Sequence, residues 1–105
     1  MDFFNDEANS RLILKRENWH CFYCLCQLSE SNYVIEHVQS RPDGDRSYKN
    51  VVAACRQCNN KKGPKSADDF LRLVYREGIV SQDELGEGLQ KLEEFTKGNL
   101  KPQLE

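Results

Sequence analysis

The sequence lacks any hydrophobic run that could cross a membrane, because no stretch approaches the roughly 18 apolar residues that a membrane helix needs. Residues 1–7 are acidic and aromatic, without the basic and then apolar order of a secretory signal. Internal repeats, low-complexity segments and obvious linkers are also missing. We therefore expect a cytoplasmic protein, with no membrane contact, that folds as a single domain over residues 1–105.

The composition is that of a small, soluble, folded domain. Charged residues make up 30% of the chain, mean hydropathy is −0.77, and ten aromatic residues argue against disorder. A chain of 105 residues buries a small core, and such folds often need a metal or a disulfide. Its five cysteines are an odd number and no secretory signal is visible, so metal binding is favoured over a disulfide framework.

Charge is distributed unevenly along the chain, although the net charge is only −2. Residues 36–65 carry seven basic and three acidic groups, a net +4, whereas residues 1–35 and 66–105 carry −2 and −4. The middle segment is therefore the part that would meet a polyanion.

Periodicity and turn residues predict an α+β chain. A helix is expected over about residues 8–18, and short strands over residues 33–35 and 50–54, separated by turn chemistry at residues 41–45. Residues 55–62 then run from a turn into a helix, which is broken near Gly63 and Pro64.

Two more helices are expected in a C-terminal extension over about residues 66–97. Ser66 resembles an N-cap, and Ser81 with Glu84 fits a capping box. Apolar residues follow both caps at helical spacing, the last of them Phe95. This pattern is typical of core packing, so these helices are assigned no chemistry.

Two Cys-x-x-Cys pairs, 30 residues apart, are the strongest chemical signal: Cys21 with Cys24, and Cys55 with Cys58. Four thiolates on two turns suit one tetrahedral Zn²⁺, and a four-cysteine site is closed, hence structural. The alternatives are buried free cysteines or adventitious disulfides. Cys26 could replace Cys24, but the x2 spacing favours Cys24, and His20 could compete as a ligand.

Four polar residues lie in and beside the insert that the two pairs enclose. Glu36 and His37 end the first strand, Asn50 opens the second, and Asn59 follows the last cysteine of the pattern. Each alone could be a solvated strand end, a turn residue or a helix-start residue. His37 is, however, the histidine of the basic segment.

Taken together, these positions resemble the HNH endonuclease family in its zinc-stapled, four-cysteine form. The resemblance covers about residues 18–65, and it includes spacings of 13 residues from His37 to Asn50 and nine from Asn50 to Asn59. It implies the ββα-metal fold, in which a hairpin and a helix hold one divalent ion. The expected fold is thus an α+β HNH core with an N-terminal helix and C-terminal helices.

The resemblance also implies roles by position. His37 would be the general base, Asn50 would support the hairpin and orient His37, and Asn59 and Glu36 would be the metal ligands. Glu36 stands where the family more often has Asp, and the proline that often follows the histidine is displaced to Pro42.

The chemistry agrees with these roles. Imidazole has a pKa near working pH, which suits removal of a proton from water. One divalent ion can neutralise charge on a phosphate, and carboxylate and amide oxygens favour Mg²⁺ or Mn²⁺ over Zn²⁺. Because adjacent strand residues face opposite sides, we expect the backbone to leave extended pairing near residues 36–38.

DNA contacts are expected from the basic segment, with Lys61 and Lys62 the best candidates. The full set is Arg41, Arg46, Lys49, Arg56, Lys61, Lys62 and Lys65. Neutralising three or four phosphates gives a log–log salt slope of about −3 to −4. Nothing resembles a base-reading helix, so low sequence specificity is expected.

The function expected from the sequence is therefore that of a metal-dependent DNA endonuclease that nicks one strand. We expect a monomer or a weak dimer, and a partner protein as the source of any sequence specificity. The alternatives are a non-catalytic zinc-stapled nucleic-acid-binding module and a thiol redox protein. A redox protein would need a reactive thiolate in a βαβ context, and no such pattern is visible.

Overall fold

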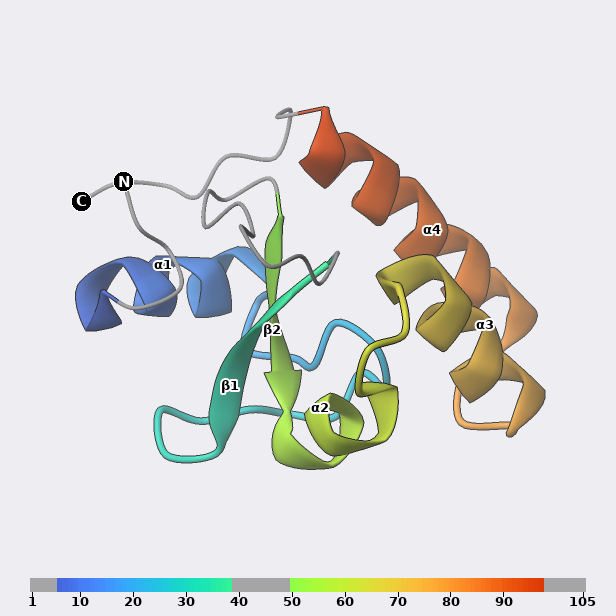
Figure 1. Ribbon diagram of the computed structural model, residues 1–105, viewed down its shortest axis with the longest axis horizontal. Helices are drawn as coiled ribbons and strands as arrows, with labels where there is room; N and C mark the ends of the chain where they lie inside the picture. Colours follow the sequence, from blue (N-terminus) through green and yellow to red (C-terminus); the bar gives the residue numbers. More distant parts are fainter. Residues whose placement is uncertain (1–5, 39–49, 98–105) are drawn as a thin grey trace.

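The computed structural model describes residues 6–38 and 50–97. Within them, a two-stranded antiparallel sheet is surrounded by four helices (Figure 1). The elements are α1 (Glu7–Arg16), β1 (Tyr33–His37), β2 (Val51–Cys55), α2 (Arg56–Lys62), α3 (Ala67–Arg76) and α4 (Gln82–Thr96). The α+β prediction is confirmed, while the turn expected at residues 41–45 lies outside the described residues.

The hairpin keeps a regular register from Tyr33 opposite Cys55 to His37 opposite Val51. β1 ends at His37, but the pairing continues one residue further, because Val38 N–H donates to the Asn50 carbonyl at 2.7 Å. The predicted departure from extended pairing is therefore not seen up to Val38, and the residues that follow lie outside the described part of the chain. The register is regular to this point, so the adjacent side chains of Glu36 and His37 face opposite sides of the hairpin. Glu36 is buried and His37 is half-buried.

The end of α1 covers the free edge of β2 with a buried ion pair. Arg16 Nε lies 2.9 Å from Glu17 Oε1, and both side chains are almost fully buried. Arg16 also donates to the Val51 carbonyl at 2.8 Å, while Ala53 N–H donates to Glu17 Oε2 at 3.0 Å. The Arg16 guanidinium stacks over the ring of Phe95, 3.9 Å from its centroid, which ties α4 to the same edge.

Loss of the Glu17 carboxylate is expected to destabilise the fold strongly. Burial raises the pKa of Glu17, with Arg16 acting against this. Glu17→Ala leaves the Arg16 guanidinium buried without its counter-ion, so the free energy of unfolding should fall by about 3–5 kcal/mol. Urea denaturation measures this, and Arg72→Ala, which removes an exposed ion pair to Asp68, is the control and should cost well under about 1 kcal/mol. Equal effects of the two substitutions would contradict the structural role of this ion pair.

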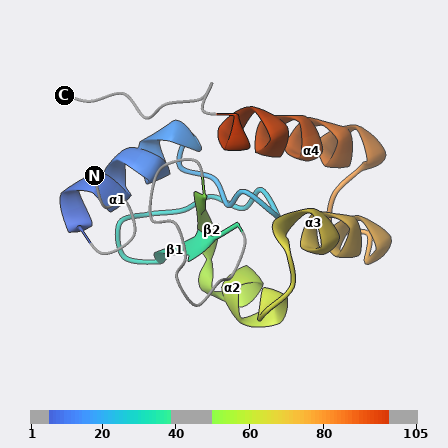
Figure 2. The same cartoon turned by 45° about the horizontal axis from the view of Figure 1, so that its top comes forward.

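α3 and α4 pack side by side beyond the hairpin (Figure 2). Ser66 caps α3, and Ser81 with Glu84 forms the predicted capping box of α4. Gly88 allows their close approach, because a Cβ there would lie 3.2 Å from Leu71 Cδ2. None of the helices in the described part of the chain is long and apolar enough to span a membrane.

Candidate metal centre and the polar residues beside it

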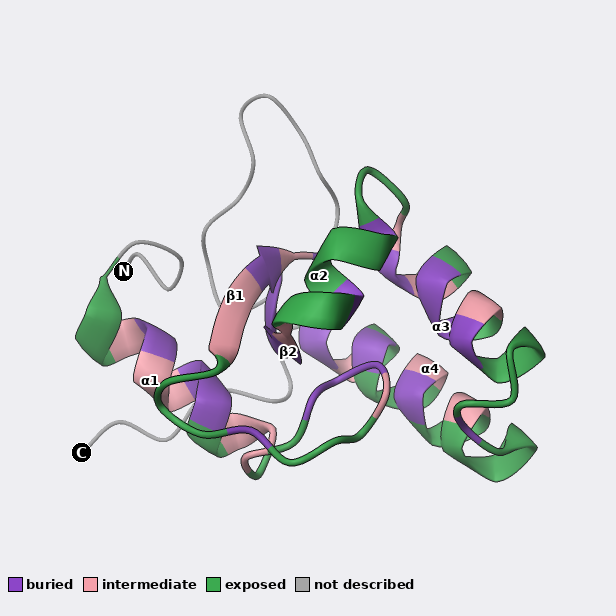
Figure 3. Ribbon diagram, turned by 90° about the horizontal axis from the view of Figure 1, so that it is seen from below, coloured by how far each residue is buried: buried purple, intermediate pink, exposed green. Residues whose placement is uncertain are grey.

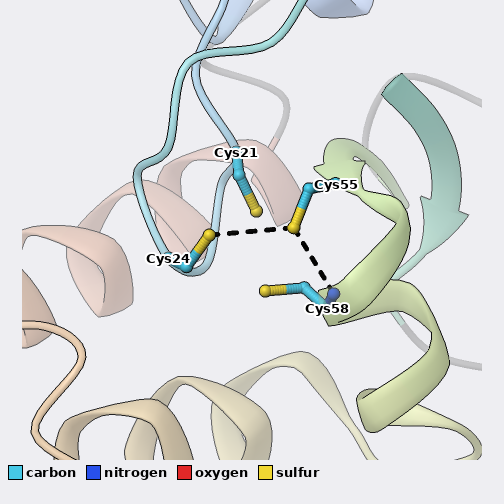
Figure 4. Close-up of side chains that lie close together, drawn as sticks. All are labelled: Cys21, Cys24, Cys55 and Cys58. Carbon is cyan, nitrogen blue, oxygen red and sulfur yellow. Dashed lines mark hydrogen bonds between the residues drawn. The ribbon is translucent and has the colours of Figure 1, made fainter. Parts of the chain in front are cut away.

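Four cysteine sulfurs converge between the loop after α1 and the start of α2 (Figure 4). All four Sγ atoms lie within 4.8 Å of one another, and those of Cys24 and Cys55 are 3.7 Å apart. A tetrahedral zinc with Zn–S bonds of about 2.3 Å places its sulfurs about 3.8 Å apart. The expected grouping of Cys21, Cys24, Cys55 and Cys58 as a metal site is confirmed, and its sulfur ligands and spacing fit Zn²⁺.

Local backbone geometry produces this convergence. Leu25 adopts a left-handed conformation with φ 67° and donates its N–H to the Cys21 carbonyl at 3.0 Å, so the loop turns tightly between the first two sulfurs. In the second pair, Cys55 is the N-cap of α2, and its sulfur accepts the N–H of Cys58 at 3.4 Å. Such N–H donors stabilise a thiolate ligand.

Hydrogen bonding among Cys21, Cys24 and Cys58 shifts the pKa values of these thiols in opposite directions. Hydrogen bonds with Cys21 and Cys58 hold the pKa of Cys24 far below its usual range, whereas the hydrogen bond with Cys24 raises the pKa of Cys21 to about 12. A dication that replaces the shared protons would bind all four residues as thiolates. The convergence of four cysteine sulfurs in one group is the donor arrangement of a closed structural zinc site.

The two competing ligands lie outside this group of sulfurs. Cys26 is exposed and is not one of the four, so the preference for Cys24 is confirmed. His20 is exposed and its Nδ1 donates to the Asn18 carbonyl at 2.7 Å. Neither residue is part of the metal group that the described residues form.

A buried polar cluster joins the cysteine loop to the hairpin and α2. The Tyr23 hydroxyl, between the first two cysteines, donates to Glu36 Oε1. Lys62 Nζ lies 3.7 Å from the same oxygen and donates to the His37 carbonyl at 3.3 Å. Burial raises the pKa of Glu36, while Tyr23 and then Lys62 lower it.

Lys62 therefore lies in the interior of the fold and not on the surface, where a DNA contact was predicted. It is 1% exposed, so its ammonium is not on the surface where a phosphate could reach it, and the expected DNA contact is wrong for this residue in the described structure. The physical reason is helical spacing. Lys62 follows the buried Cys58 by four residues and so lies on the same inward face of α2. Figure 3 shows that most of the outer surface of α2 is exposed.

The other predicted site residues lie around this end of the hairpin. His37 is the last residue of β1, and Asn50, just before β2, accepts the Val38 N–H through its carbonyl. Asn59 is exposed on α2, one turn before Lys62. Because Lys62 contacts the His37 carbonyl, α2 and the end of β1 lie against each other.

Exposed basic residues remain on and after α2. Arg56 and Lys65 are exposed, and Lys65 Nζ lies 3.5 Å from the Lys61 carbonyl. Lys61 is exposed and pairs with Glu77 at 2.7 Å, which raises its pKa. Arg41, Arg46 and Lys49 lie outside the described residues.

Sequence reasoning did not identify Tyr23 as part of the site. The signal available was its position, because a tyrosine enclosed by a Cys-x-x-Cys pair must lie near the metal site. A buried tyrosine also needs a hydrogen-bond partner for its hydroxyl. The sequence could not show that this partner would be Glu36.

Comparison with protein-family models agrees with the resemblance read from the sequence. Residues 21–65, which contain both cysteine pairs and the hairpin, match the family model of the HNH endonucleases. Among solved structures, the chain is similar to the Type II-C Cas9 enzyme from Actinomyces naeslundii, with a TM-score of 0.49 and 19% identity. That match covers 87% of this chain but only 11% of the other. No curated protein matches the chain.

Proposed function

We propose that this chain, in which residues 21–65 match the family model of the HNH endonucleases, is a metal-dependent enzyme that hydrolyses DNA phosphodiester bonds. The observation that carries the proposal is the family match over the same residues that fold into the hairpin, α2 and the four-cysteine site. One active centre in a monomer cuts one strand, so nicking with low sequence specificity is the proposed outcome.

His37 is the proposed general base. It ends β1 beside α2, and its half-buried imidazole would take the proton from a water molecule that attacks the phosphorus. Asn50, whose backbone holds the last described hydrogen bond of the hairpin, would keep His37 in place.

Glu36 and Asn59 are the proposed ligands of a catalytic Mg²⁺ or Mn²⁺. Carboxylate and amide oxygens form the hard donor set that these ions prefer. Both described contacts of Glu36, with Tyr23 and Lys62, involve Oε1, so coordination is assigned to Oε2. When bound, the ion would neutralise charge on the phosphate and on the departing oxygen.

The experiment that tests the proposal is DNA cleavage by the zinc-loaded protein with added Mn²⁺ or Mg²⁺. Strand cleavage that requires the added ion supports the nuclease. DNA binding without cleavage under either ion would favour the non-catalytic zinc-stapled binding module instead.

Arg56 and Lys65, with Lys61, are the proposed phosphate contacts among the described residues. We expect Arg56→Ala and Lys65→Ala each to weaken DNA binding and to reduce the log–log salt slope by about 1, because each neutralises one phosphate. Titrations at several salt concentrations measure this slope. Lys97→Ala on α4, where Lys97 pairs with Glu93, is the control and should leave the slope unchanged. Unchanged slopes in both Arg56→Ala and Lys65→Ala would place the DNA elsewhere.

A further inference from the structure

The buried contact of Tyr23, Glu36 and Lys62 joins three separate parts of the fold. Tyr23 belongs to the cysteine loop, Glu36 to β1 and Lys62 to the end of α2. Their exposed fractions are 1%, 6% and 1%, and Glu36 Oε1 faces both the Tyr23 hydroxyl and the Lys62 ammonium. The Lys62 ammonium also donates to the His37 carbonyl at 3.3 Å.

Such a buried cluster fixes positions more than it adds stability. A buried lysine is costly, and its desolvation is offset only by a counter-charge and by hydrogen bonds of good geometry. Here the carboxylate of Glu36 supplies the charge, and the carbonyl of His37 supplies an acceptor. These partners lie on consecutive residues of β1, so the ammonium binds the strand at the point where it ends.

The four-cysteine site holds the cluster from both sides. Cys21 and Cys24 flank Tyr23 in the loop, while Cys55 caps the helix whose last residue is Lys62. A metal that binds these cysteines therefore sets the relative position of the tyrosine and the helix, and through them the position of β1.

We propose that Tyr23 and Lys62 are positioning residues, which hold His37 in a fixed place relative to the four-cysteine site through Glu36 and the His37 carbonyl. This inference rests on the proposed function, since His37 is the residue that is positioned. It assigns Lys62 to the interior of the catalytic domain and not to the DNA surface. It also gives the four-cysteine site a second effect beside stabilising the fold, which is to set the position of His37.

The test is nitrogen-15 NMR of the imidazole rings in the zinc-loaded protein, which has two histidines. Tyr23→Phe and Lys62→Met should shift the His37 signals and leave those of His20 unchanged. Lys62→Arg keeps a cation and a hydrogen-bond donor. Its His37 signals should therefore lie closer to the wild-type positions than those of Lys62→Met. Tyr75→Phe and Lys97→Met are matched exposed controls and should move neither histidine. Zinc content and circular dichroism identify any variant that has not folded, and Tyr23→Phe and Lys62→Arg still decide the question if Lys62→Met does not fold.

Cleavage kinetics distinguish the loss of a positioning contact, which lowers kcat, from the loss of a DNA contact, which raises the Kd for DNA. We expect kcat to fall by roughly 10–100-fold in Lys62→Met, because a small displacement of a catalytic group is costly, while the Kd for DNA stays unchanged. Unchanged His37 signals in both folded Tyr23→Phe and Lys62→Met would overturn the proposal. So would weaker DNA binding with unchanged kcat. If the wild-type protein cleaves no DNA, the proposed function fails. The NMR shifts alone then decide whether Tyr23 and Lys62 hold His37 in place.

Discussion

Removal of the metal from the four-cysteine site is expected to unfold the centre of the chain. The site joins the loop after α1 to the β2–α2 junction, and Cys21 and Cys58 are buried in the core. Structural zinc binds such sites with roughly 10–16 kcal/mol, which is as large as the whole stability of a typical domain at about 5–15 kcal/mol. A strong chelator should therefore abolish the dispersed NMR signals of the core, and added Zn²⁺ should restore them.

Single cysteine substitutions test the same claim by position. Cys58→Ser should lose zinc and fold poorly. Cys26→Ser should retain one zinc per chain, because Cys26 is exposed and lies outside the group of four. Loss of zinc in Cys26→Ser, or a chelated protein with unchanged core signals, would contradict the assignment of the site.

Substitution of the proposed base is expected to have the second large effect. General base catalysis contributes about 10²–10⁴-fold to rate, so His37→Ala should lower the rate of DNA cleavage by that factor. The fold and the zinc content should be kept, because His37 is only half-buried at the end of β1 and is not a ligand of the cysteine site. Initial rates on a labelled DNA duplex with saturating Mn²⁺ measure the effect.

The chain provides a matched control in its other histidine. His20 is exposed beside Cys21 and donates to the Asn18 carbonyl, so His20→Ala should cleave DNA at close to the wild-type rate. Equal losses in the two variants would mean that the effect is not specific to the proposed base.

The sequence predicted those parts of the fold that depend on local chemistry. The capping box of Ser81 and Glu84 is a short-range pattern, and it starts α4 where expected. Each Cys-x-x-Cys pair is also a short-range pattern. A tetrahedral zinc site needs four ligands, so the presence of two such pairs predicted that they would lie together in the fold. The family resemblance supplied the order of strands and helix that a periodicity argument could not.

Contacts between distant segments were missed for a physical reason. Arg16 and Glu17 form hydrogen bonds with the backbone of β2, which lies some 35 residues further along the chain. Nothing in the local sequence around Arg16 and Glu17 indicates these contacts. Lys62 was predicted to contact DNA because of its charge and its position after the start of the helix beside the site. Its spacing of four from Cys58 was the available signal, since a metal ligand must face inward and its helical neighbour faces the same way.

Supercoiled plasmid gives the most direct test of the central claim, that this is a nuclease with a structural metal and a separate catalytic metal. Protein with one bound zinc would be incubated with the plasmid alone, with Mn²⁺ and with Mg²⁺, beside His37→Ala. The account predicts relaxed circles that form only with added Mn²⁺ or Mg²⁺, precede linear DNA and are nearly absent with His37→Ala. Intact plasmid under every condition, with zinc content and fold verified, would contradict it.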